Sequence, residues 1–93
     1  MDFHESGFDG LELMTLRRFL AIAETGSINA AAQKLHMAQP PLSRQMRQLE
    51  NRLGLPLFER GKRTVRLTEA GKLLQQRAGQ LLGLAGNTVK ELR

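Results

Sequence analysis

Two adjacent prolines, Pro40 and Pro41, place the start of a helix to within a residue or two. Proline has no backbone N–H, so it is tolerated in a helix only in the first turn, where the N–H groups have no partner inside the helix. The helix must therefore begin at about Ala38 or Gln39. From there the apolar residues recur at spacings of four, three and four, which is typical of one face of an amphipathic helix: Leu42, Met46, Leu49 and Leu53.

The opposite side of this helix carries amide, hydroxyl and guanidinium groups. Gln39, Ser43 and Arg47 share that side, with Pro40 and Arg44 beside them. These groups match the donors and acceptors on DNA base edges and phosphates. The pattern predicts a helix with one side in a core and the other side available to DNA.

Two shorter helices are predicted before it. The first fits Leu13 to about Thr25 and ends at Gly26, and Ser27 caps the second. The residues expected to be buried are Leu13, Leu16, Phe19, Leu20 and Ala23 in the first helix, and Ile28, Ala31, Ala32 and Leu35 in the second. A tight turn at His36 then leads to the proline-initiated helix, which predicts a helix-turn-helix. We interpret His36 as a packing or hydrogen-bonding residue of that turn, not as a metal ligand.

A small two-stranded wing is predicted after Gly54 and Pro56, which end the third helix. Leu55, Leu57 and Phe58 make a short apolar stretch, and Gly61-Lys62-Arg63 a basic tip. From Thr64 to Leu67 polar residues alternate with the inward Val65 and Leu67, as in a half-buried strand.

The last helix is predicted from Thr68, a good N-cap, toward Arg93. Its apolar stripe follows spacings of four and three, through Leu74, Ala78, Leu81, Ala85, Thr88 and Leu92, and it is widened by Leu73, Leu82 and Val89. Its four glycines weaken an isolated helix, so packing must compensate. A second copy of the chain is the favoured partner, and folding of the stripe onto the chain's own core is the alternative.

The composition excludes several classes of protein. With 93 residues the chain makes one small domain with a modest core. It has no cysteine, and its two histidines lie far apart, so no metal site is expected. We find no signal peptide and no apolar run long enough to cross a membrane, so a cytoplasmic protein is expected. No catalytic constellation or cofactor motif is present, and we expect no enzyme.

The basic residues are concentrated behind an acidic leader. The net charge is +5, but four of the nine acidic residues precede the first basic one, so residues 13–93 carry fourteen basic residues against five acidic ones. Eight of them lie between Lys34 and Arg66. This region is the electrostatic footprint expected of a nucleic-acid-binding domain, although basic residues can also serve solubility alone.

From Leu13 to Gly71 the chain resembles the N-terminal DNA-binding domain of LysR-type transcriptional regulators. The resemblance rests on motifs in a fixed order: Leu16-Arg17-Arg18-Phe19, Ala23-Glu24-Thr25-Gly26-Ser27-Ile28, Ala31-Ala32, Leu35, Gln39-Pro40-Pro41-Leu42-Ser43-Arg44-Gln45, Leu49-Glu50, Leu53-Gly54, Leu57-Phe58-Glu59-Arg60, Arg63 and Leu67-Thr68-Glu69-Ala70-Gly71. Each motif is weak by itself, and the series is specific.

The resemblance implies a mainly α-helical fold, a winged helix-turn-helix followed by a long helix that pairs across a homodimer. We accordingly divide the chain into a leader (1–10), the winged helix-turn-helix (11–67) and a linker helix (68–93). It also implies binding of double-stranded DNA at an interrupted palindrome near promoters, and an effector-binding domain that we expect to lie outside this chain. The leader is unusual for the family, and Ile28 replaces a common phenylalanine in the core.

The family pattern assigns the base contacts to the third helix. Gln39 suits adenine, Arg44 suits guanine, and Pro40 and Pro41 suit a thymine methyl group, while Ser43 reaches a base or a phosphate. Alternatively, Gln39 is a solvated residue and Arg44 pairs with a carboxylate on the surface.

Phosphate contacts are expected from Ser27 and Asn29, where Ser27 can also cap its helix, and from Arg47, which pairs with Glu50 in the alternative. Glu50 itself is interpreted as the structural partner of an arginine. Ala38 stands at a further phosphate position, where many family members have serine.

In the wing, Arg63 is expected to enter the minor groove, with Lys62 and Thr64 on the flanking phosphates. Arg60 either contacts phosphate or holds the wing to the third helix. Two other functions remain open from the residues alone: a basic protein that binds DNA without sequence preference, and a protein-interaction module built on the last helix.

Overall fold

The computed structural model describes residues 11–61 and 64–93, and the leader 1–10 and the wing-tip residues Lys62 and Arg63 lie outside them. The elements follow the predicted order: α1 (Leu13–Thr25), α2 (Ile28–Lys34), α3 (Gln39–Leu53), β1 (Phe58–Arg60), β2 (Val65–Leu67) and α4 (Glu69–Leu92). The predicted fold class, a mainly helical winged helix-turn-helix with a long last helix, is confirmed.

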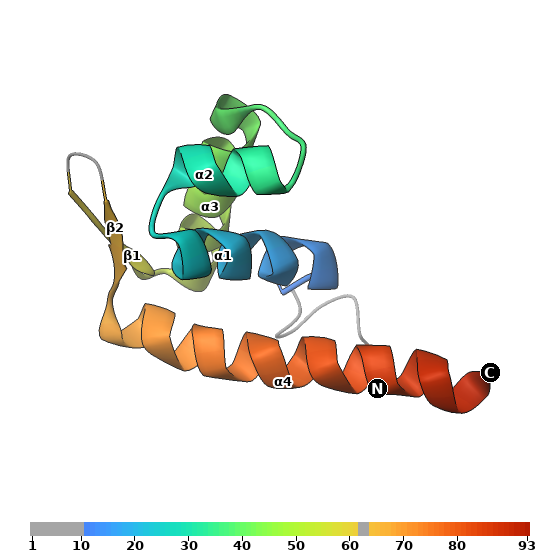
Figure 1. Cartoon of the computed structure of the whole chain (residues 1–93). Coiled ribbons are helices and arrows are strands. Elements are labelled where there is room, and N and C mark those ends of the chain that lie inside the picture. Colours follow the sequence, from blue (N-terminus) through green and yellow to red (C-terminus); the bar gives the residue numbers. More distant parts are fainter. Residues whose placement is uncertain (1–10, 62–63) are drawn as a thin grey trace.

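Helix α1 lies in the middle of the molecule. Helices α2 and α3 pack on one side of it, and α4 runs along the other side (Figure 1). Apolar side chains from α1, α2, α3, β1 and the residue before β1 form one core: Phe19, Ala21, Ile22, Ala31, Ala32, Leu42, Met46, Leu49, Leu57 and Phe58. The rings of Phe19 and Phe58 join α1 to the wing, with their centroids 5.3 Å apart. The core therefore holds α3 and the wing to one rigid base.

The helix boundaries lie where the capping residues predicted them. Gly26 ends α1 and Gly54 ends α3, both in the left-handed conformation that glycine adopts without strain. The Ser27 hydroxyl accepts a hydrogen bond from the backbone N–H of Ala30 at 3.1 Å, as an N-cap does. Helix α3 begins at Gln39, after the extended residue Ala38, and has its prolines in the first turn.

The wing is a two-stranded antiparallel hairpin in which Phe58 lies opposite Leu67 and Arg60 opposite Val65. The backbone N–H of Val65 donates to the carbonyl of Gly26 at 2.9 Å, so β2 is tied to the turn between α1 and α2. As predicted, Val65 and Leu67 pack against the core.

The predicted core of α1 needs two corrections. Leu13 was expected to be buried but is 48% exposed, whereas Ala21 and Ile22, which were not in the predicted set, are buried. Leu13 borders a hollow of about 280 Å³ between the first turn of α1 and α4, which Leu82 and Val89 also line. His36 was expected to pack or to form a hydrogen bond in the turn. Its side chain is exposed, and its backbone N–H donates to the carbonyl of Gln33 at 3.2 Å. Its backbone has a φ of 56°, so it is the backbone of His36 that shapes the turn.

Helix α4 is buried only in part. Thr68 caps it as predicted, because its hydroxyl accepts from the N–H of Gly71 at 3.0 Å. Of its predicted apolar stripe, Ala78 is buried and three residues are half-buried: Leu74, Leu82 and Ala85. The exposed apolar residues are Leu73, Leu81, Leu84, Val89 and Leu92. The stripe thus folds partly onto the chain's own body, as the alternative interpretation held, and much of it stays uncovered.

Gly71 lets α4 lie close to the backbone of Leu57, the residue before β1. A Cβ atom added there would overlap the backbone carbonyl of Leu57, whereas one added at Gly79 would meet nothing within 4 Å.

Within the described residues, no helix is both long and apolar enough to span a membrane.

Candidate nucleic-acid interface

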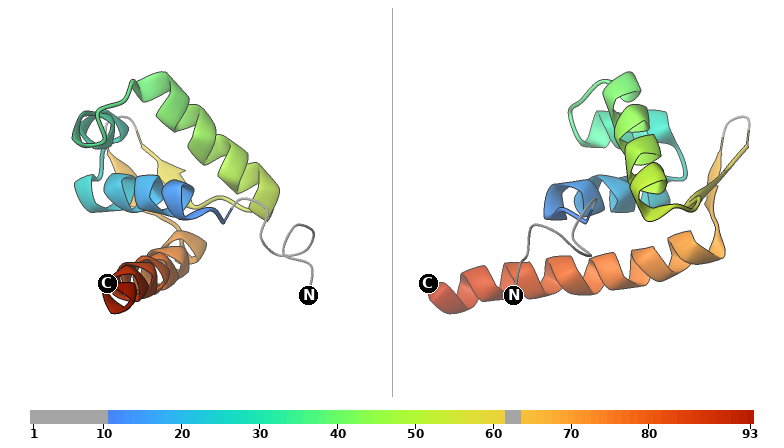
Figure 2. Two further views of the ribbon diagram at one scale, coloured as in Figure 1. Left: turned by 90° about the vertical axis from the view of Figure 1, so that its right-hand side faces the viewer. Right: turned by 180° about the vertical axis from the view of Figure 1, so that it is seen from behind.

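Helix α3 presents its polar side to solvent. Pro40, Pro41, Arg44 and Arg47 are exposed, and Gln39 and Ser43 are partly exposed; the apolar residues Leu42, Met46 and Leu49 are buried on the other side. The amino-terminal end of α3 points away from α4, as does the hairpin (Figures 1 and 2). The predicted base-contacting residues of the third helix are therefore free of the protein's own core.

The start of α2 lies next to the wing, because the carbonyl of Gly26 accepts from Val65 in β2. Ser27 is half-buried and uses its oxygen as the cap of α2, which leaves its hydroxyl hydrogen for another acceptor. Asn29 is exposed in the first turn of α2, and Thr64 is exposed just before β2. The structure thus brings three of the predicted phosphate-contacting residues into one region.

The rest of the predicted wing contacts lie outside the described residues: Lys62, Arg63 and the side chain of Arg60. Ala38, the remaining predicted phosphate position, is exposed at the N-cap of α3. Arg66, which was not singled out, is exposed on β2, at the position opposite Glu59. Its place in the alternating pattern of Thr64 to Leu67 was the signal that could have found it.

Glu50 anchors the wing to α3. Its carboxylate accepts hydrogen bonds from the backbone N–H groups of Leu57 at 2.7 Å and Phe58 at 3.2 Å. The sequence predicted a structural role for Glu50 through an arginine. The backbone contacts were missed, because the chain reverses at Gly54 and brings residues seven and eight positions later back to the carboxylate.

A second polar link joins α3 to α1. Arg18 Nη1 donates to Gln45 Oε1 at 2.8 Å, and Gln45 Nε2 donates to Thr15 Oγ1 at 3.3 Å. Sequence reasoning missed this link, because the partners lie 27 and 30 residues apart. Only the polar character of Gln45, next to the buried Met46, hinted at it.

The geometry suits binding to a nucleic acid. Exposed guanidinium, amide and hydroxyl groups are mounted on elements fixed to one core, and such groups hydrogen-bond to phosphates and base edges. No three His, Asp or Glu residues of the described part of the chain lie close enough together to hold a metal ion.

Comparisons with known proteins agree with this geometry. The model of the bacterial regulatory helix-turn-helix proteins of the lysR family matches residues 13–72. The HTH-type transcriptional regulator TfdT of Cupriavidus pinatubonensis is 49% identical over 74 residues, which are 80% of this chain. Those residues are 32% of TfdT, so the chain spans about a third of that regulator's length.

Two solved structures with DNA have the same fold. One is the CbnR_DBD–DNA complex, with 44% identity and a TM-score of 0.84 over 88% of this chain and 94% of that one. The other is the BenM_DBD complex with benA site 1 DNA, with 46% identity and a TM-score of 0.84 over 87% of this chain and 91% of that one.

Proposed function

Because the chain belongs to the lysR family of bacterial regulatory helix-turn-helix proteins, we propose that it binds double-stranded DNA of a particular sequence as a homodimer. The observation that carries this proposal is the polar side of α3, which is exposed along its first two turns while its apolar side is buried. The related CbnR and BenM domains were solved in complex with DNA, which supports the same use of the fold here.

Helix α3 enters the major groove in this proposal. Gln39 and Arg44 hydrogen-bond to base edges, adenine and guanine respectively, and Pro40 and Pro41 contact thymine methyl groups. Ser43 adds a hydrogen bond to a base or a phosphate. All five residues are at least partly exposed, which supports their use in direct readout.

The phosphate contacts surround this helix. Ser27 and Asn29 come from the start of α2, Ala38 and Arg47 from α3, and Thr64 from the edge of the wing. These contacts fix the position of the domain without selecting a sequence. Lys62 and Arg63, outside the described residues, complete the proposal: Arg63 enters the minor groove and Lys62 binds the backbone beside it.

The homodimer forms through α4. Five large apolar side chains of this helix are exposed: Leu73, Leu81, Leu84, Val89 and Leu92. Apolar surface of this extent on one helix is stabilised when a second copy covers it. Two copies related by a two-fold axis would read two half-sites, so the expected target is an interrupted palindrome near a promoter.

The division of the chain follows from these roles. Residues 1–10 form a leader, 11–67 the winged helix-turn-helix and 68–93 the linker and dimerisation helix. Regulation of transcription places the protein in the cytoplasm, where the bacterial chromosome lies.

The test is a selection of duplexes from a random pool with this chain. We expect a two-fold symmetric motif among the bound duplexes, and affinity for it should fall steeply with salt. A pool without any enriched sequence would contradict the proposal and favour a basic protein without sequence preference.

Two arginines of α3 then separate readout from charge. Arg44→Ala should lower the affinity for the selected duplex about 5- to 150-fold, because a good bidentate base contact is worth about 1–3 kcal/mol. Arg52→Ala is the matched control, since Arg52 is an exposed arginine further along the same helix, on the edge toward α1. An equal loss in both variants would show that Arg44 acts only through its charge.

A further inference from the structure

The rotation of α3 about its own axis decides where its base-reading side chains point. The helix rests on the core through an apolar stripe of Leu42, Met46 and Leu49. Apolar packing is not directional, so a stripe of this kind limits rolling of a helix less strictly than hydrogen bonds do. A second kind of contact is therefore needed to fix the roll angle.

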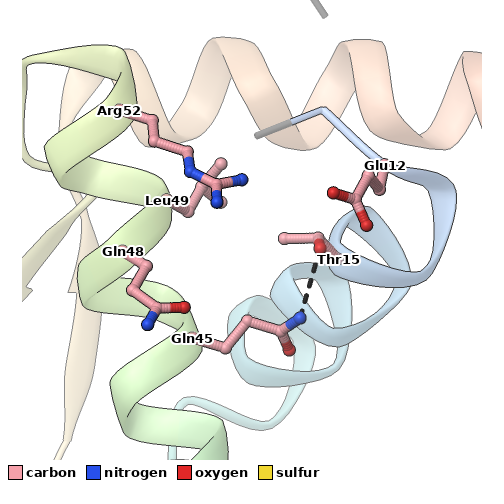
Figure 3. A pocket seen from close by; sticks show the side chains of 6 residues that line it. All are labelled: Glu12, Thr15, Gln45, Gln48, Leu49 and Arg52. Carbon is pink, nitrogen blue, oxygen red and sulfur yellow. Dashed lines mark hydrogen bonds between the residues drawn. The ribbon is translucent and has the colours of Figure 1, made fainter. Parts of the chain in front are cut away.

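Gln45 supplies such a contact on the edge of α3 that faces α1. Its side-chain oxygen accepts from Arg18 Nη1 at 2.8 Å, and its nitrogen donates to Thr15 Oγ1 at 3.3 Å. Figure 3 shows the second of these bonds, with Gln45 reaching from α3 toward Thr15 across a hollow. A guanidinium can only donate, so Arg18 fixes which end of the amide faces it and which end faces Thr15.

The Thr15 end of this link is buried, and Gln45 and Arg18 are half-buried. Thr15 is only 6% exposed. Among the described residues it is the one polar residue whose side chain is buried. A buried hydroxyl without a partner is costly, so Thr15 holds the Gln45 amide in place and resists any roll that would separate them.

The other edge of α3 is held by Glu50, whose carboxylate accepts from the N–H groups of Leu57 and Phe58. The helix is therefore fixed by directional bonds on both sides of its apolar stripe. The Glu50 contacts lie one turn beyond Gln45, further from the base-reading end. Gln45 is adjacent in sequence to Arg44, so it is the link that controls the first two turns.

We propose that Gln45 is a positioning residue for sequence readout: its bonds to Thr15 and Arg18 set the roll angle of α3 and hence the direction of Gln39 and Arg44. This inference rests on the proposed DNA-binding function. An α-helix with its side chains is about 10–12 Å across, so a roll of about 10° moves an outer side-chain atom by about 1 Å. Binding geometry tolerates only about 0.5 Å, so such a roll is enough to lose a base contact.

The test replaces Gln45 by methionine, which keeps the length of the side chain and removes both hydrogen bonds. In Gln45→Met we expect the affinity for the selected duplex to fall about tenfold, as when one base contact is lost. The affinity for a scrambled duplex and the slope of affinity against salt should change little, because the phosphate contacts proposed for Ser27, Asn29 and Thr64 do not depend on the roll of α3.

A double variant separates positioning from stability. Thr15→Val with Gln45→Met leaves no buried hydroxyl without its partner, so the stability lost in Gln45→Met should largely return. Discrimination between the selected and the scrambled duplex should remain low, because the directional link is still absent. If discrimination returned together with stability, the role of Gln45 would be structural only and the proposal would be overturned.

Gln48→Met is the matched control. Gln48 is an exposed glutamine of the same helix that lines the same hollow, and this substitution should leave discrimination unchanged (Figure 3).

A readout without DNA keeps the inference separate from the proposed function. Residual dipolar couplings of the Cα–Hα bonds, which point away from the helix axis, measure the roll of α3 relative to α1 in the free chain, and Gln45→Met should change it. An unchanged orientation would overturn the inference even if the wild-type chain discriminates between duplexes. A changed orientation, in a wild-type chain without sequence preference, would support the positioning role and contradict only the proposed function.

Discussion

Helices α3 and α4 have similar amphipathic patterns in the sequence but different surroundings in the structure. In α3 the apolar stripe is covered by the same chain, and Leu42 and Met46 have no exposed surface. Helix α4 packs along α1 on one side only, and Leu84 is 66% and Leu92 is 82% exposed. The same kind of pattern therefore serves an internal core in one helix and an open surface in the other.

Length explains the difference. At about 1.5 Å per residue, the 13 residues of α1 extend about 20 Å and the 24 residues of α4 about 36 Å. Helix α1 can therefore cover only about half of α4, and the carboxyl-terminal end of α4 runs beyond the body of the domain (Figure 2). An apolar stripe therefore predicts a surface that becomes covered, and the relative lengths of the helices decide whether the same chain covers it.

The apolar stripe of α3 should be much more sensitive to truncation than the exposed side of α4. Leu42→Ala should lower the free energy of unfolding by about 2–5 kcal/mol, because it leaves a cavity in a packed core. Leu84→Ala removes the same atoms from an exposed site and should change it by less than about 0.5 kcal/mol in a dilute sample. Urea denaturation measures both. Similar losses in the two variants would mean that Leu84 is covered within the monomer.

Two glycines of α4 should respond in opposite directions to replacement by alanine. Gly71→Ala should lower the free energy of unfolding by about 1–3 kcal/mol, because the added methyl group overlaps the backbone carbonyl of Leu57. Gly79→Ala should raise it by up to about 1 kcal/mol, because that site is open and alanine is the better helix former. Thermal unfolding followed by circular dichroism reports both. A higher free energy of unfolding in Gly71→Ala would show that α4 does not lie against the backbone of Leu57.

Much of the fold was predictable because local chemistry sets it. Pro40 and Pro41 located the start of α3, Gly26 and Gly54 the ends of α1 and α3, and Thr68 the start of α4. Each of these residues acts on its own backbone, so no knowledge of the tertiary structure was needed.

The missed features depend on residues that are distant in sequence. Gln45 meets Thr15 and Arg18 only once α3 crosses α1, and no periodicity encodes that meeting. Leu13 fits the period of a buried stripe, but the hollow beside α4 leaves it exposed. The direct contacts of the predicted DNA-binding residues remain predictions, because they concern a second molecule.

Truncation of the exposed Leu84 of α4 should weaken the association of two copies of the chain. Sedimentation equilibrium of Leu84→Ala should show a dimer that dissociates about tenfold more readily than the wild type, since each copy loses part of a leucine contact, about 1–2 kcal/mol in total. Lys90→Ala, at an exposed charged site of the same helix, is the control and should leave association unchanged. Unaltered association in Leu84→Ala would place the contact between copies elsewhere.

Removal of the N-cap side chains of α2 and α4 should lower stability only slightly. Ser27→Ala and Thr68→Ala should each lower the free energy of unfolding by about 1 kcal/mol, because each removes a hydrogen bond to the first turn of its helix. Thr68→Ala should lower it slightly more, because the Thr68 hydroxyl also donates to the carbonyl of Pro56 at 2.8 Å.

DNA affinity then distinguishes the start of α2 from the start of α4. Only Ser27→Ala should also weaken binding to selected and scrambled duplexes alike, since a phosphate contact carries no sequence information. If both variants bound DNA equally well, Ser27 would be a cap and nothing more.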